Sequence, residues 1–177
     1  MKTITSQRLT IRRLKLKDAQ NLHAYRSNPE VVKYQSFSCL NLAETISLIE
    51  KFRYDVPDHW CQLGIAIRET DQLIGDCALR ILGDKAEVGI TISHLFQQRG
   101  FAKEALSGLI TYLFEHNKVK WILGIADERN HASIRMLTSL GFVRQRQLTQ
   151  NVLFKDEWVD EFHFTLHRKI WTASPLV

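Results

Sequence analysis

Three runs of strand-forming residues follow one another between residues 62 and 92, and very short turns connect them. The runs are Gln62–Arg68, Leu73–Ile81 and Ala86–Ile92, with Glu69-Thr70-Asp71 and Gly83-Asp84-Lys85 between them. Connections this short join antiparallel neighbours, because a parallel pair needs a crossover of about a dozen residues or more. We therefore expect an antiparallel meander at the centre of the fold.

The residues on either side of the meander predict helices and further strands. In chain order these are a strand at 8–12, a helix from Lys17-Asp18 to about Ser27 with Asp18 as its N-cap, a short helix after Pro29, a helix opened by the capping-box spacing of Asn41 and Glu44, a helix at 101–117, a strand at 121–126, a helix from Asn130 to Gly141, and a long hairpin at 142–168 turning near Lys155-Asp156-Glu157. The order predicts a mixed α/β (α+β) fold in which helices cover both faces of one sheet.

Length and composition narrow the class of protein. The chain has 177 residues, of which 45% are hydrophobic and 24% are charged, so we expect a single globular domain over residues 1–177. No stretch approaches the roughly 20 apolar residues of a membrane helix. The first eight residues, Met1 to Arg8, lack the apolar core of a secretory signal, which favours a cytoplasmic protein. The net charge of +5 is spread along the chain and brings no nucleic-acid-binding motif.

The cysteines and histidines give no pattern typical of a metal site. The three cysteines, Cys39, Cys61 and Cys77, are widely spaced and form no CxxC, which argues against both zinc and a disulfide framework. His163 and His167 fall on the same face of a predicted strand, but no third ligand accompanies them. We expect no metal, and free thiols without a catalytic role.

One segment carries recognisable binding chemistry. Gln97-Gln98-Arg99-Gly100-Phe101-Ala102 lies between a predicted strand and a predicted helix. Gly100 permits a tight turn and a close approach by a ligand, and the free N–H groups of the following helix favour an anion. Arg99 and Lys103 add positive charge. The segment suits a phosphate or pyrophosphate, although it is neither a P-loop nor a dinucleotide-binding fingerprint.

Several motifs together resemble the GNAT superfamily of acetyl-CoA-dependent N-acetyltransferases. The loop pattern Q/R-x-x-G-x-G/A is met by Gln97, Gly100 and Ala102, and Asn130-His131-Ala132-Ser133 with Leu140-Gly141-Phe142 is similar to a second signature. The strand Ser6–Arg12, the run Gly89–Ile92 and the segment Asp156–Phe162 resemble the RimJ/RimL-like branch, the ribosomal-protein N-terminal acetyltransferases. The likeness extends over about residues 6 to 171, in the expected order.

The resemblance implies a fold, a cosubstrate and the residues that hold it. The sheet is expected to be mostly antiparallel, with a V-shaped splay between the fourth and fifth strands, Ala86–Ile92 and Trp121–Ala126. Acetyl-CoA is the implied cosubstrate. Its implied contacts are the backbone of Ile90, Thr91 and Ile92, the loop residues Gln97, Gln98, Arg99, Gly100, Phe101, Ala102 and Lys103, and the residues Asn130 and Ser133.

The resemblance also implies direct attack of an amine on the thioester, without an enzyme nucleophile. Many members place a tyrosine seven residues after the asparagine as the thiol acid, but that position is Leu137 here. Ser133 occupies the place of a serine in the RimL-like branch, and we expect it to hydrogen-bond the departing thiolate. Glu87 is the expected general base. Asp76, Asp127, Glu128 and Asp160 are rival bases that remain open.

The acceptor stays undecided at this level. A protein N-terminus is one candidate, a small amine such as an aminoglycoside or polyamine is another, and a non-catalytic acyl-CoA-binding sensor is a third reading from a different class. The segments Asn28–Cys39 and Lys155–Asp160 are expected to contact the acceptor. Either a monomer or a homodimer is compatible with the sequence.

Overall fold

A nine-stranded sheet organises the computed structural model, which describes residues 2–37, 39–52, 54 and 58–171. The strands are β1 (Ile4–Thr5), β2 (Leu9–Arg13), β3 (Cys61–Ile67), β4 (Leu73–Leu82), β5 (Lys85–Ile92), β6 (Trp121–Asp127), β7 (Val143–Arg144), β8 (Gln150–Phe154) and β9 (Glu157–His167). The helices are α1 (Ala19–Arg26), α2 (Pro29–Val32), α3 (Leu42–Lys51), α4 (Phe101–His116) and α5 (His131–Ser139), with short 3-10 turns η1 (Leu16–Asp18), η2 (His94–Phe96) and η3 (Arg146–Leu148).

The strand order is β1-β2-β3-β4-β5-β6-β9-β7, with β8 pairing on β9. Strands β3, β4 and β5 form the predicted antiparallel meander. Strands β5 and β6 are parallel neighbours, because α4 carries the chain back across the sheet between them. The mostly antiparallel α/β arrangement expected from the sequence is confirmed.

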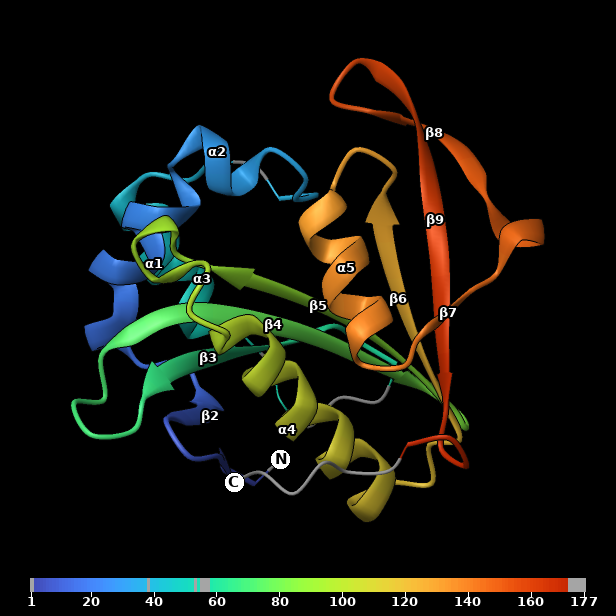
Figure 1. The fold of residues 1–177 in the computed structure, drawn as a ribbon. Coiled ribbons are helices and arrows are strands. Elements are labelled where there is room, and N and C mark those ends of the chain that lie inside the picture. Colours follow the sequence, from blue (N-terminus) through green and yellow to red (C-terminus); the bar gives the residue numbers. More distant parts are fainter. Residues whose placement is uncertain (1, 38, 53, 55–57, 172–177) are drawn as a thin grey trace.

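Strands β5 and β6 part from each other halfway along their length. Their pairing runs from Lys85 opposite Trp121 to Val88 opposite Gly124 and then ends. Strand β5 nevertheless stays paired to β4 as far as Ile92, and β6 stays paired to β9 through its last residue. Figure 1 shows the two strands diverging from a common base. This is the expected V-shaped splay.

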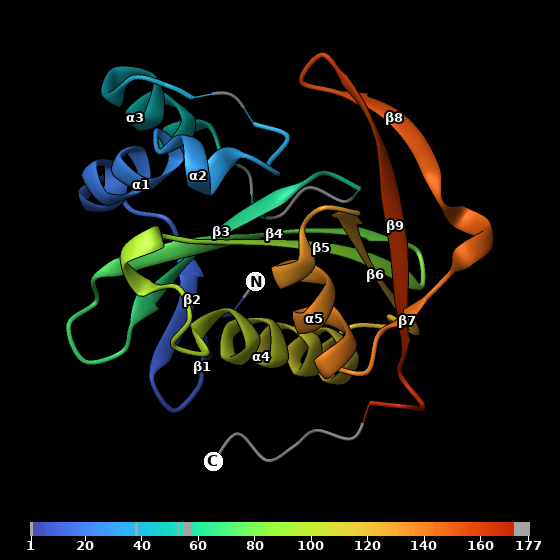
Figure 2. The same ribbon diagram turned by 45° about the horizontal axis from the view of Figure 1, so that its top comes forward.

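Helices cover both faces of the sheet (Figure 2). One hydrophobic cluster joins the inward stripe of α4, which contains Ala105, Leu109 and Leu113, to buried side chains of the sheet and of α5. A second cluster, around Leu22 and Tyr25, packs α1, α2 and α3 on the opposite face. In the part of the chain described above, no helix is both long enough and apolar enough to cross a bilayer.

Two local expectations differ from the structure. The Asp18 carboxylate does not cap α1 but accepts hydrogen bonds from Arg12 Nη1 and from the backbone N–H of Lys15, both at 2.7 Å. The Asp18 carboxylate, predicted from the sequence to cap the helix, is therefore bound by the buried guanidinium of Arg12 instead. The hairpin at 142–168 is also interrupted, because β7 and β8 pair separately with β9 and η3 lies between them.

Candidate functional site

The loop before α4 has the backbone geometry of an anion site. Gly100 is the N-cap residue of α4 at φ 78°, and Gln98 two residues earlier is also left-handed at φ 61°. The first N–H groups of a helix have no intrahelical acceptor and carry the positive end of its dipole. Loops with left-handed residues of this kind make concave arrays of N–H groups that bind anions. The predicted phosphate loop thus has the backbone shape that its chemistry needs.

The predicted loop residues divide into anchors and exposed groups. Gln97 Nε2 donates to the Ile92 carbonyl at 2.9 Å, which ties the loop back to β5. Phe101 is buried in the core, and Ala102 packs against it. Gln98, Arg99 and Lys103 are exposed at the helix entrance, available to a ligand. These last two cations lie beside the helix N-terminus, as the sequence predicted.

Arg8 and Glu104 brace this loop, and sequence reasoning missed both. Arg8 Nε donates to Glu104 Oε2 at 2.7 Å, and Arg8 Nη1 donates to the Arg99 carbonyl at 3.1 Å. The Arg8 guanidinium also lies 4.4 Å from the centre of the Phe101 ring. Burial alone would raise the pKa of Glu104, but hydrogen bonds from Ser6 and Arg8 outweigh it and lower the pKa. A residue far away in sequence thereby holds the loop in shape.

The splay exposes one edge of β5. Beyond Val88, residues 89–92 have no ladder partner on the side of β6 among the described residues. A Cβ built on Gly89 would have no described atom within 4 Å, so the sheet face opposite the Val88 side chain is open at this residue. Unpaired N–H and C=O groups at a strand edge are available to a ligand with amide groups. Ile90, Thr91 and Ile92 therefore lie where an extended ligand could pair with the backbone.

Asn130 and Ser133 lie across the opening, at the start of α5. Asn130 Oδ1 accepts the backbone N–H of Ser133 at 3.1 Å, so Asn130 is the predicted helix cap. Within the described residues, the Ser133 hydroxyl makes no hydrogen bond of its own. Leu137, at the position where a tyrosine acid was absent, is 3% exposed and packs over Gly124. The Ser133 hydroxyl thus remains free for a ligand.

Glu87 lies at the base of the splay, one residue before the last β5–β6 pair. Its neighbours Ala86 and Val88 pack in the core beneath α4, so alternation puts Glu87 on the opposite face of the sheet. Its carboxylate accepts a hydrogen bond from Arg80 Nη2 at 2.8 Å. The guanidinium thus binds one of the two carboxylate oxygens, Oε2. Glu87 therefore lies toward the closed end of the splay, whereas Ser133, in the helix that follows β6, lies toward its open end.

Three of the four rival carboxylates, those of Asp76, Asp127 and Asp160, are engaged in contacts within the fold. Asp76 is 1% exposed and accepts hydrogen bonds from Tyr25 and Arg26. Hydrogen bonds from Arg129 hold the pKa of Asp127 below its usual range. Asp160 accepts a hydrogen bond from Asn151 at 2.9 Å, whereas Glu128 is exposed and pairs through its backbone.

His163 is a buried histidine that the sequence did not single out for the reaction. It is 9% exposed, and its Nε2 has no hydrogen-bond partner among the described residues. His167 instead lies edge-on to Trp121 at 4.1 Å between ring centres. No group of three potential metal ligands occurs in the described ranges. The buried thiol of Cys77 has its pKa raised by burial, which disfavours the reactive thiolate.

The anion site before α4, the free edge of β5 and the start of α5 form one continuous line. A ligand with a pyrophosphate followed by an extended amide-bearing arm fits that line. The arm would end between β5 and β6, near Asn130 and Ser133.

Comparison with known proteins agrees with this description. A sequence model of the acetyltransferase (GNAT) domain matches residues 8–143. An uncharacterized N-acetyltransferase, p20 of Bacillus licheniformis, is 29% identical over 174 residues, covering 96% of this chain and 98% of that protein.

Solved structures share the fold at lower identity. A GNAT-family acetyltransferase from Bacillus anthracis has a TM-score of 0.83 at 21% identity, covering 95% of this chain and 99% of its own. RimL, the ribosomal L7/L12 α-N-protein acetyltransferase, has a TM-score of 0.77 at 15% identity, covering 94% and 98%. A spermidine N-acetyltransferase from Vibrio cholerae has a TM-score of 0.78 at 20% identity, covering 92% and 96%. The fold is thus shared by proteins that act on different amines.

Proposed function

Because the chain belongs to the GNAT family of acetyltransferases and is an acetyl-CoA-dependent N-acetyltransferase, we propose that its acceptor is the α-amine of a protein N-terminus. The resemblance of several segments to the RimJ/RimL-like branch supports this acceptor. The observation that supports acetyl-CoA binding is that the left-handed Gly100, at the start of α4, lies next to the free edge of β5. Together they fit the pyrophosphate and the pantetheine arm of acetyl-CoA.

The reaction needs a neutral amine, a stabilised oxyanion and a leaving thiolate. In our proposal the N–H groups of β5 at 90–92 hold the arm and an oxyanion, as preorganised donors do in acyl transfer. Ser133 donates a hydrogen bond to the departing sulfur, and Glu87, at the closed end of the splay, accepts the proton of the amine through water. The amine attacks the thioester carbon, the C–S bond breaks, and the acetyl group ends on nitrogen.

Ser133→Ala is expected to lower kcat by about ten- to a hundredfold, because a hydrogen bond to a charged group contributes about 1.5–3 kcal/mol. The KM for acetyl-CoA should change by less than about twofold, since Ser133 meets the charge only as the thiolate leaves. Steady-state kinetics at saturating acceptor measure both constants. An unchanged kcat would remove Ser133 from the mechanism.

Glu87→Gln is expected to lower kcat/KM for the acceptor by about a hundredfold or more, because a positioned base contributes 10²–10⁴. The ascending limb of the pH–rate profile should disappear with it. Glu128→Gln and Asp160→Asn, which remove rival carboxylates, should retain that limb. If one of these two loses the limb and Glu87→Gln keeps it, the base is misassigned.

Release of free thiol from acetyl-CoA across a panel of amines tests the proposal as a whole. We expect release with N-terminal peptides to exceed release with spermidine and aminoglycosides. A preference for a small amine would instead assign small amines as the acceptor class of this enzyme. Tight binding of acetyl-CoA without thiol release on any amine would favour a sensor.

We further propose that residues 1–177 act as one domain in the cytosol, as a monomer or a homodimer that takes no nucleic acid or membrane as partner. Light scattering after gel filtration gives the oligomeric state.

A further inference from the structure

A cavity of about 400 Å³ lies apart from the phosphate loop, between the segment after α2 and the tip of the β8–β9 hairpin. Figures 1 and 2 both show this segment reaching toward the hairpin above the splay. The residues that form its walls are Val32, Ser36, Phe37, Cys39, Leu153, Phe154 and Lys155.

The walls combine the apolar side chains of Val32, Phe37, Leu153 and Phe154 with the hydroxyl of Ser36, and the charge near them is positive. Lys155 is the charged side chain among the described lining residues, and no carboxylate is among them. Leu153 is 60% exposed at the hairpin surface, so much of its apolar side chain is accessible to a ligand. Such a pocket favours an apolar group and disfavours a second ammonium, which needs a carboxylate or a ring of oxygens.

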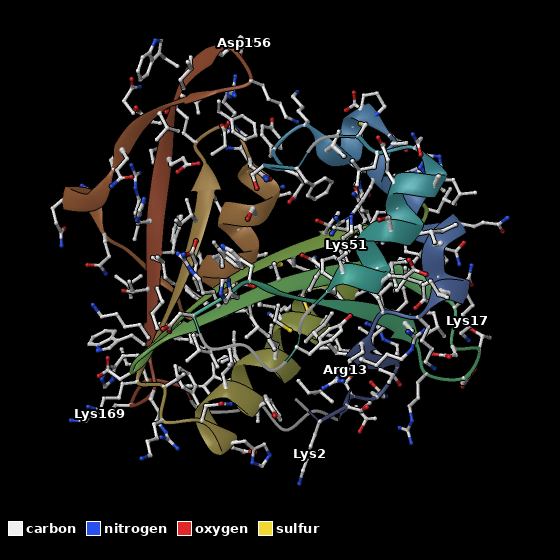
Figure 3. The ribbon with its side chains drawn as sticks, turned by 180° about the vertical axis from the view of Figure 1, so that it is seen from behind. Lys2, Arg13, Lys17, Lys51, Asp156 and Lys169 are labelled. Carbon is white, nitrogen blue, oxygen red and sulfur yellow. The ribbon has the colours of Figure 1, made fainter. Side chains whose placement is uncertain are left out.

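The pocket is held in shape by contacts between chain segments that are distant in sequence. Lys155 and Asp156 form the two-residue hairpin turn with φ of 49° and 67°, a conformation that is strained for side-chain-bearing residues. Lys155 Nζ donates to the Val32 carbonyl at 2.6 Å, which fastens this turn to the end of α2. Arg129 Nη1 donates to Glu157 at 2.8 Å beside it. Figure 3 labels Asp156 at the outer tip of the hairpin.

The distance between this pocket and the splay follows from strand register. Phe154 at the pocket is opposite Glu157, whereas Asp127, the last residue of β6 at the open end of the splay, is opposite Glu161. From Glu157 to Glu161 the strand advances four residues, or about 13 Å. An acceptor whose amine lies in the splay therefore reaches the pocket with a group about 13 Å away.

We propose that this pocket binds the apolar side chain of about the fourth residue of an extended N-terminal peptide. An extended chain covers about 3.3 Å per residue, so three to four residues span the distance. The inference rests on the proposed function and adds a side-chain preference to it. A linear polyamine has no apolar side group for these walls and gains no carboxylate from them.

A peptide series tests the proposal. The peptides share one N-terminal residue in a glycine/serine background and carry a phenylalanine as their second, fourth or sixth residue, or an aspartate as their fourth. We expect the KM of the peptide with the fourth-residue phenylalanine, the matched peptide, to be about tenfold below that of the others, since a partly buried aromatic ring gains about 1.4 kcal/mol. Equal KM values across the series would overturn the proposal.

Leu153→Asp provides the second arm, because this leucine is exposed and its replacement leaves the core intact. It should raise the KM of the matched peptide about tenfold without changing the KM of acetyl-CoA. Leu16→Asp is the control variant, since Leu16 is 56% exposed at η1, in a different part of the fold, and should change neither constant. A Leu153→Asp enzyme with an unaltered KM for the matched peptide would contradict the subsite. Thiol release from no amine at all would instead refute the proposed function.

Discussion

Replacing Gly100 with aspartate is expected to weaken coenzyme A binding by about a hundredfold or more while the protein stays folded. The new carboxylate would stand at the N-cap of α4, where the pyrophosphate is proposed to bind. Like charges about 4 Å apart repel by several kcal/mol at the effective dielectric of a protein surface, and a hundredfold loss needs about 2.7 kcal/mol. Titration calorimetry with coenzyme A measures the change.

Gly100→Asn is the matched control for this substitution. Asparagine and aspartate both tolerate the left-handed conformation that Gly100 has at φ 78°, and both are favourable N-caps. A Cβ built on Gly100 would have Arg8 Nη2 as its nearest described atom beyond the adjacent residues, at 3.5 Å. Either side chain can therefore be attached at this position without a clash at its Cβ. We expect the asparagine substitution to weaken coenzyme A binding by about tenfold at most. If the two variants lost the same affinity for coenzyme A, the size of the added side chain rather than its charge would explain the loss.

Asp76→Asn is expected to lower the free energy of unfolding by about 3–5 kcal/mol, because it leaves a buried guanidinium without its counter-charge. Arg26 Nη2 and Asp76 Oδ1 are 2.9 Å apart, and both side chains are almost fully buried. Tyr25 also donates to Asp76, at 2.6 Å, and Gln62 Nε2 is a further donor to it. Burial raises the pKa of Tyr25 well above its usual value, which keeps the hydroxyl protonated and able to donate. Denaturant unfolding followed by tryptophan fluorescence gives the stability.

Two further variants separate the charge from the packing. Tyr25→Phe removes one hydrogen bond and should cost about 1–3 kcal/mol. The double change Arg26→Met with Asp76→Leu removes both charges and should recover most of the loss seen in Asp76→Asn. If Asp76→Asn unfolds within about 1 kcal/mol of the parent, the ion pair does not fasten α1 to the sheet as described.

The Asp76 network has a direct bearing on the site. Asp76 is opposite Thr91 in the β4–β5 register, so the network lies next to the strand that borders the splay. Because four donors from Tyr25, Arg26 and Gln62 use its carboxylate, Asp76 has a structural role rather than that of the base considered from the sequence.

Features with a local cause were predicted well. The meander follows from strand runs and short turns, the capping box of Asn41 and Glu44 is present, and Gly100 has the left-handed conformation expected of a turn. Asn130 caps α5 as predicted. Each of these depends on residues within a few positions of one another, so the sequence pattern carries the information.

Features that depend on tertiary contacts escaped the sequence. Arg8 reaches Glu104 across 96 positions, and no local pattern marks that pair. Asp18 has the residue type of a helix cap, but the nearby Arg12 takes its carboxylate. The cavity at the hairpin tip depends on the contact of Lys155 with Val32, which are 123 positions apart. The sequence predicted that the segments Asn28–Cys39 and Lys155–Asp160 contact the acceptor, but it did not indicate the cavity that parts of both segments line.

A crystal structure with coenzyme A bound tests the central claim most directly. We predict the pyrophosphate on the N–H groups of residues 99–103, the pantetheine amides along residues 90–92 of β5, and the sulfur between β5 and β6 within hydrogen-bond distance of Ser133. Coenzyme A bound elsewhere, or with its sulfur away from the splay and from Ser133, would contradict this account of the site.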